Sequence, residues 1–283
     1  MRHVEQWLTE SPYCKTLGIE CAAIDSDRCL LRLPFRAANA NQSGVLHGGV
    51  AASLSACVGQ AVARSVFGQA SGPWHTVDIQ INYLAAATNE TLQAEGRLLR
   101  NGKDLCYAGI EIRGGGDKLI ASAIVLVRGR FGATLAALPD RRINVPASGP
   151  APMGERILNS AFIAARGMRM TYQQNGECHI AMPWLETNGE LGGGVHEGAA
   201  LALLDTAGAM AAFALTGFAA GRASTPSIQA QVFTPIPAAG LEAHARVAFR
   251  DGDMFWSDAE ICNTQDGLVC ARGTVVYRIV PAK

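Results

Sequence analysis

Two segments of the chain carry residue types that could stabilise a negatively charged oxygen and activate a water molecule. The first, NQSGVLHGGVAASLSACV, contains Asn41, His47, Gly48 and Gly49; the second, GELGGGVHEGAALALLDTA, contains Asp205. Glycines at a helix start leave backbone N–H groups accessible, and the positive end of the helix dipole favours a developing oxyanion. A carboxylate in an apolar helix must face a cavity or have a raised pKa, because an unpaired buried charge is costly. Either condition suits a general base or a nucleophile.

The same two segments are repeats of one another. An offset of 149 positions places His47 over His196 and Gly18 over Gly167. Further along the chain, GIEIRGGGDKLIA aligns with DAEICNTQDGLVC in the same order, with small drifts of the kind that surface-loop insertions produce. A period of this length is a whole domain rather than a solenoid repeat. The chain is therefore expected to be a tandem of two copies of one fold.

The repeat divides the chain into two domains of similar length. At 283 residues the chain is long for one domain, and its 49% apolar residues are enough for two hydrophobic cores. We expect the domains at 1–133 and 153–283. The segment 134–152 between them contains four prolines and is expected to be a linker.

Each copy has the same order of expected elements. Short helical pieces come first (HVEQWLTES and GERILNSAF), and strands with alternating polarity follow (CLLRLPF and CHIAMPW). The runs at 48–67 and 197–217 lack proline and are rich in Ala and Leu, which predicts long helices buried on most sides. Strands such as TVDIQINYL, TLQAEGRLLR, LCYAGIEIRG and LIASAIVLVRG close the first copy. The sequence therefore predicts an α+β fold with an antiparallel sheet around one long helix in each copy.

Composition and charge argue against several functional classes. The 24 basic and 24 acidic side chains balance, so no overall basic field points to a nucleic-acid partner. We see no signal-peptide pattern, and the apolar runs are interrupted by Gly, Ser, Gln and Asp, so we expect no membrane span and a cytoplasmic location. The eight cysteines form no CxxC pairs and have no histidines at zinc-finger spacing. We expect reduced structural cysteines, with no metal and no cofactor.

Together, these patterns resemble a known family. An asparagine six positions before a His-Gly-Gly tripeptide, a buried helix beginning there, an acid nine positions after the histidine and the strand TVDIQINYL are similar to the hotdog-fold acyl-CoA thioesterases of the phenylacetyl-CoA thioesterase (PaaI-like) type. The resemblance covers most of both copies. It implies two tandem hotdog domains packed as a pseudo-dimer, with an active site between the two long helices. We also expect two double-hotdog chains to associate as a homodimer.

Carried over residue by residue, the resemblance implies one complete site. It combines Asn41, His47, Gly48 and Gly49 of the first copy with Asp205 of the second. The glycines would provide the oxyanion hole and also bind substrate, Asn41 would hold water or orient the carbonyl, and Asp205 would be the general base or the nucleophile. His47 would orient the loop or contact the thioester. The alternative is that His47 only caps the loop and that Asp205 is a structural acid.

The opposite site is expected to be degenerate. Glu190 stands in place of the asparagine, His196 is followed by Glu197 instead of glycine, and Ala56 stands where the acid belongs. We expect His196 to be structural and both glutamates to be solvated.

In the family, a Ser or Thr at the start of the strand after the helix assists near the acid and the substrate. Aligning TVDIQINY with SIQAQVFT sets Thr76 over Ser227. Since Ser227 belongs to the same copy as the acid, it is the better candidate of the two.

The reaction implied by the resemblance is hydrolysis of an acyl-CoA thioester to the free acid and CoA, at one complete site per chain. Two alternatives stay open. An acyl-CoA or acyl-carrier-protein hydratase or dehydratase could use tandem hotdogs, although Gln42 stands where an Asp-x-x-x-x-His motif would have its acid. A non-catalytic acyl-CoA-binding module would fit the missing second acid. The acyl group and the choice between CoA and carrier protein are not determined by the sequence.

Overall fold

The computed structural model of the protein describes residues 2–133, 142, 148–217 and 221–281. Its twelve strands join one sheet with the order β1-β2-β4-β5-β6-β3-β9-β12-β11-β10-β8-β7. The first copy supplies β1 (Glu20–Ile24), β2 (Arg28–Leu33), β3 (Trp74–Tyr83), β4 (Leu92–Asn101), β5 (Leu105–Arg113) and β6 (Leu119–Gly129). The second copy supplies β7 (Arg169–Gln174), β8 (Glu177–Met182), β9 (Gly221–Val232), β10 (Leu241–Asp251), β11 (Met254–Asn263) and β12 (Val269–Pro281).

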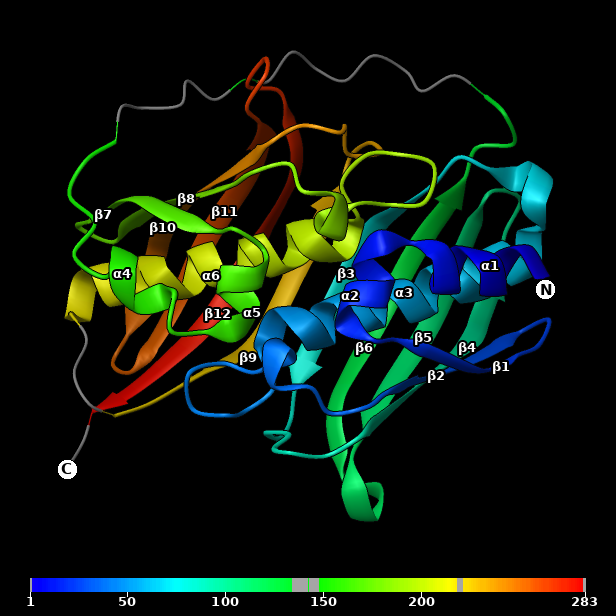
Figure 1. The fold of residues 1–283 in the computed structure, drawn as a ribbon, viewed down its shortest axis with the longest axis horizontal. Helices are drawn as coiled ribbons and strands as arrows, with labels where there is room; N and C mark the ends of the chain where they lie inside the picture. The colour runs from blue at the N-terminus through cyan, green and yellow to red at the C-terminus, as the bar shows by residue number, and fades with distance from the viewer. Residues whose placement is uncertain (1, 134–141, 143–147, 218–220, 282–283) are drawn as a thin grey trace.

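The helices follow the same repeat. They are α1 (Arg2–Glu10), α2 (Pro12–Leu17) and α3 (Gly48–Phe67) in the first copy, and α4 (Gly154–Ile157), α5 (Ala161–Ala165) and α6 (Glu197–Thr216) in the second. Short 3₁₀ turns lie at Ala37–Asn39, Gln69–Ser71, Gly115–Asp117 and Glu186–Asn188. Figure 1 shows α3 and α6 on the same face of the continuous sheet, each crossed by the strands of its own copy. The predicted α+β double hotdog is the observed fold.

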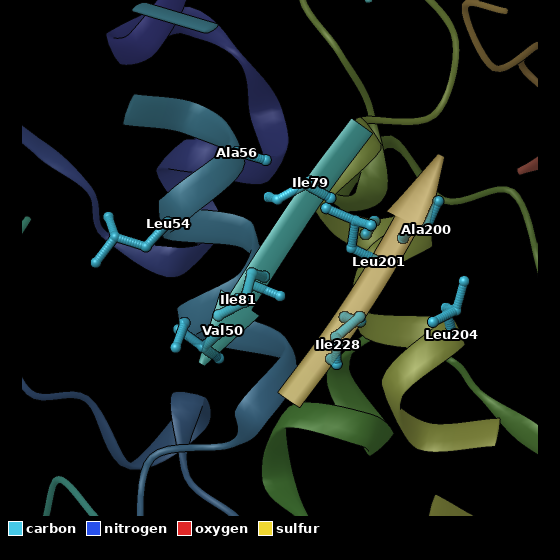
Figure 2. Packing of buried hydrophobic residues seen from close by; sticks show 14 of the residues in the cluster. Val50, Leu54, Ala56, Ile79, Ile81, Ala200, Leu201, Leu204 and Ile228 are labelled. Atoms are coloured by element: carbon cyan, nitrogen blue, oxygen red, sulfur yellow. The ribbon is translucent and has the colours of Figure 1, made fainter. Parts of the chain in front are cut away.

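The two long helices form the centre of the hydrophobic core. Both are buried along almost their whole length, as their apolar composition on every face predicts. Figure 2 shows Ile81 of β3 beside Ile228 of β9, with Val50 of α3 on one side and Leu204 of α6 on the other. These four side chains are fully buried, and burial of each contributes about 1.5–3 kcal/mol. The core therefore runs without a break across the boundary between the copies.

The copies are related by a local two-fold axis through the middle of the sheet. Strands β3 and β9 pair antiparallel, and Gln80 faces Gln229, its own counterpart 149 positions later. Gly18 and Gly167, also 149 positions apart, both have the left-handed backbone conformation, with φ angles of 79° and 68°. Residues 149 positions apart in the sequence are thus equivalent in the structure. The two-fold axis that relates them brings the N-terminal ends of α3 and α6 to the same central region.

Two further expectations concern the linker between the copies and the absence of a membrane span. The expected linker at 134–152 lies mostly outside the described residues, so the domain boundaries stay a prediction. Helices α3 and α6 are long and apolar enough to cross a membrane, but 83% of the most apolar window of each is buried inside the protein. Core helices of this kind pass the same test of length and composition.

Candidate active site

The first copy's site begins at the cap of α3. His47 is the N-cap residue, and its Nδ1 accepts a hydrogen bond from the Gly49 N–H at 3.0 Å. The His47 carbonyl accepts from the Val50 N–H at 2.9 Å, which fixes the peptide plane that carries the Gly48 N–H. Asn41 holds the preceding loop, because its Oδ1 accepts from the N–H of Ser43 at 2.8 Å. The predicted contact of Asn41 with water or substrate stays a prediction.

Asp205 of the second copy lies directly in front of this helix start. Its Oδ2 is 3.9 Å from His47 Nδ1. A Cβ atom added to Gly48 would come within 2.7 Å of the same oxygen. A side chain at position 48 would push the carboxylate out of its observed position, so glycine at this position allows the close approach of Asp205 to the start of α3.

Burial determines the protonation of both groups. Asp205 is 3% exposed. Burial raises its pKa to about 6, although hydrogen bonds from Thr225 and from the Gly49 backbone oppose the rise. Burial lowers the pKa of His47 to about 4. His47 is therefore neutral at pH 7, in agreement with its Nδ1 acting as a hydrogen-bond acceptor.

Two aromatic residues that the sequence does not point to, Tyr83 and Phe162, also contact this half of the site. The Tyr83 hydroxyl donates to the Gly48 carbonyl at 3.1 Å and so fixes the peptide between Gly48 and Gly49. The Phe162 ring packs on the His47 ring at 4.8 Å between centroids. Burial, together with the nearby Asp205, raises the pKa of Tyr83 well above its ordinary value. The only sequence signal for Tyr83 is its place at the end of the strand after the helix.

Thr225, and not the predicted Ser227, is the partner of Asp205. The pairing of β3 with β9 shows an offset of 149, whereas matching TVDIQINY to SIQAQVFT assumes an offset of 151. The counterpart of Thr76 is consequently Thr225, not Ser227. Thr225 Oγ1 donates to Asp205 Oδ1 at 2.9 Å. Alternating polarity is compatible with both alignments, because they differ by one full strand period.

The opposite half-site, formed by Ala56, Glu190 and His196, is filled with side chains. Glu197, at the position equivalent to Gly48, is buried, and its carboxylate accepts from the Thr76 N–H and from Gln60 Nε2, both at 3.0 Å. The expectation that Glu197 is solvated is wrong, since two donors of the other copy, the Thr76 N–H and Gln60 Nε2, bond to its carboxylate.

Glu190 is also held by the protein. It accepts hydrogen bonds from Trp7 Nε1 and from Ser11 Oγ, the latter at 3.1 Å, and its side chain is 22% exposed. The expectation of a solvated Glu190 is therefore wrong as well. His196 caps α6 as His47 caps α3, with Nδ1 accepting from the Gly198 N–H at 3.0 Å, and the Tyr13 ring stacks on it at 5.0 Å.

Comparisons with known proteins agree with this architecture. Residues 4–105 match the family model described as a domain of unknown function, DUF4442. A protein of Saccharolobus solfataricus, provisionally named an esterase, is 27% identical over 110 residues, which are 39% of this chain and 77% of that protein.

Two solved structures are similar over nearly the whole chain. A hot dog fold protein of unknown function from Alicyclobacillus acidocaldarius has a TM-score of 0.68 and 14% identity and covers 98% of both chains. An acyl-CoA thioesterase II of Mycobacterium marinum has a TM-score of 0.65 and 9% identity and covers 93% of this chain and 97% of that one. These similarities confirm the double hotdog fold from one end of the chain to the other.

The buried charge of Asp205 predicts a pH-dependent effect on stability. Its pKa is about 6 in the folded protein and 3.8 ordinarily, so between these values the native state binds more protons than the unfolded chain. The free energy of unfolding therefore falls as the pH rises through this window. We expect Asp205→Asn to raise the free energy of unfolding at pH 8 by on the order of 1–3 kcal/mol, and by much less near pH 4. Urea unfolding at both pH values measures the difference.

The control is Asp258→Asn, which removes an exposed carboxylate on β11. It should produce no comparable gain at pH 8. An equal effect of Asp205→Asn at the two pH values would contradict the assignment of a buried charge.

Proposed function

We propose that the chain hydrolyses acyl-CoA thioesters to the free acid and CoA, at one site per chain that both copies build. The observation that carries the proposal is the position of the Asp205 carboxylate in front of the glycine-capped start of α3. The fold shared with an acyl-CoA thioesterase II and the sequence similarity to a provisionally named esterase support it. Association of two chains and a cytoplasmic location stay predictions from the sequence.

The start of α3 is suited to hold the thioester oxygen. The Gly49 N–H is shared between His47 Nδ1 and the Asp205 carboxylate, so the Gly48 N–H is the donor that we assign to the carbonyl oxygen of the substrate. Negative charge on that oxygen increases as the tetrahedral intermediate forms, and the helix dipole adds to the stabilisation. Loss of one such donor typically costs about 2.7–4 kcal/mol in the activation barrier.

Asp205 is suited to activate the attacking group. As a general base it would take a proton from water while the water oxygen adds to the carbonyl carbon; the intermediate then expels the CoA thiolate. As a nucleophile it would itself displace the thiolate and form an anhydride that water hydrolyses. Both routes need the ionised carboxylate. Thr225 would hold the carboxylate in place through Oδ1 and leave Oδ2 directed toward the helix start.

The first test of this function is the loss of turnover in Asp205→Asn. CoA release from a panel of acyl-CoAs, followed by thiol detection, should fall by roughly 10²–10⁴-fold in kcat. The matched control is Glu197→Gln, which changes the buried carboxylate of the opposite half-site and should leave turnover within about threefold of the wild type. Full activity of Asp205→Asn would refute the assignment, and a comparable loss in Glu197→Gln would show that the opposite half-site takes part. Substrate binding without turnover in the wild type would indicate a binding module.

The pH dependence of kcat/KM provides a second test. Since the ionised form of Asp205 is required and its pKa is about 6, kcat/KM should rise with pH through a midpoint near that value and level off above it. The Thr225 hydroxyl lowers the pKa of Asp205, so Thr225→Val should move the midpoint to higher pH. A profile that is flat from pH 5 to pH 8, or a midpoint that Thr225→Val moves to lower pH, would be incompatible with Asp205 as the titrating group.

A further inference from the structure

Three groups that commonly bind metals meet in the half-site that lacks the catalytic residues. Cys14 on α2, Cys57 on α3 and His196 at the start of α6 are all buried, and their Sγ and Nε2 atoms lie within 4.8 Å of one another. The two Sγ atoms are 3.7 Å apart, and Nε2 is 3.6 Å from the Cys14 sulfur and 3.8 Å from the Cys57 sulfur. None of these residues has a place in the proposed hydrolysis.

These distances have the size of the edges of a zinc tetrahedron. With Zn–S bonds of about 2.3 Å and Zn–N bonds of about 2.0 Å, tetrahedral angles place two sulfurs about 3.8 Å apart and sulfur and nitrogen about 3.5 Å apart. The observed S···S edge of 3.7 Å and S···N edges of 3.6 and 3.8 Å lie within about 0.3 Å of these values. Two thiolates and one imidazole are also a donor set that zinc prefers over magnesium or calcium.

The cluster is specific to this half of the chain. The positions equivalent to Cys14 and Cys57 in the second copy, 149 residues later, are Ile163 and Thr206. His47, the counterpart of His196, packs against Phe162. Both thiols therefore occur only beside the histidine that has no catalytic acid opposite it.

The protons of the cluster are arranged so that a metal could replace them. The thiols of Cys14 and Cys57 lie within hydrogen-bond distance of each other and of His196 Nε2, so a metal bound between them would displace the thiol protons. His196 Nδ1 accepts the Gly198 N–H, so a neutral ring has its proton on Nε2, the atom directed at the sulfurs. Binding of a metal at Nε2 moves that proton to Nδ1, which breaks the capping hydrogen bond, while the two thiols release their protons to solvent. The loss of one capping hydrogen bond is small beside three metal–ligand bonds.

We propose that Cys14, Cys57 and His196 bind one Zn²⁺ ion, which ties α2 to α3 and to the loop before α6. Glu190 is the carboxylate placed to supply a fourth ligand, since its Oε2 is 3.6 Å from His196 Nε2. Trp7 and Ser11 hold the other carboxylate oxygen and so fix the direction of this side chain. The ion would stabilise the contact between the copies in the half-site that the hydrolysis does not use.

The test is the metal content of the full-length chain, purified with a thiol reductant. Elemental analysis should find about one zinc per chain. Exchange for Co²⁺ should produce strong near-ultraviolet thiolate-to-cobalt absorption and the visible bands of a tetrahedral site. Cys57→Ser should reduce the zinc content and the cobalt bands at least about tenfold. The matched control, Cys106→Ser, changes a buried cysteine on β5 outside the cluster and should keep both.

The wild-type spectrum makes the proposal falsifiable even if the Cys57→Ser chain does not fold. Folded, reduced wild-type chain that holds no zinc and develops no cobalt bands would overturn it. Zinc that remains in folded Cys57→Ser would be bound elsewhere and would also overturn it, as would a disulfide between Cys14 and Cys57 in chain that has been purified with reductant. Because none of these readouts is enzymatic, their failure is distinguishable from a failure of the proposed hydrolysis.

Discussion

The candidate active site depends on one close approach, that of the buried Asp205 carboxylate to the glycine-capped start of a helix from the other copy. A side chain at position 48 would occupy the space of the carboxylate, and a charged carboxylate in an apolar core is unfavourable without partners. The N-terminus of α3, the Thr225 hydroxyl and the Gly49 N–H supply those partners. The continuous sheet and the packing of α3 against α6 hold them in register, because the local two-fold axis passes through the pairing of β3 with β9.

Fusion of two copies in one chain frees the two half-sites from having the same sequence. A symmetric homodimer must use each residue twice, whereas this chain has glycine at position 48 and glutamate at the equivalent position 197. Glu197 fills its half-site and bonds to Thr76 and Gln60 of the other copy. One half-site thus has the arrangement proposed for catalysis, and the other is filled by packed, hydrogen-bonded side chains.

Much of this arrangement could be predicted from the sequence, because it follows from local patterns. The helix predicted at 48–67 is α3, and the one predicted at 197–217 ends a single residue earlier. The family resemblance implies pseudo-dimeric packing, and that packing brings His47 and Asp205 into the same region. The equivalence of Gly18 and Gly167 is also visible in the sequence, because both end a helical segment with a left-handed residue.

The parts that could not be predicted depend on contacts between distant segments. Alternating polarity shows on which face of the sheet a strand residue lies, but it does not distinguish alignments that differ by two positions. The sequence therefore points to Ser227, whereas the structure has Thr225 beside the acid. Glutamate is usually a surface residue, so the sequence gives no reason to expect Glu190 and Glu197 inside the protein. Their position follows from hydrogen bonds donated by residues of the other copy. The Cys14–Cys57–His196 cluster joins positions up to 182 apart, a spacing that matches no metal-binding motif.

The central claim is that residues of both copies form one site and that the opposite half-site is closed. Its most direct measurement is the number of molecules of a non-hydrolysable thioether analogue of an acyl-CoA bound per chain, obtained by isothermal titration calorimetry. The account predicts about one per chain, with binding lost in Gly48→Val because the added side chain would meet the Asp205 carboxylate. Two molecules per chain, or undiminished binding in Gly48→Val, would contradict it.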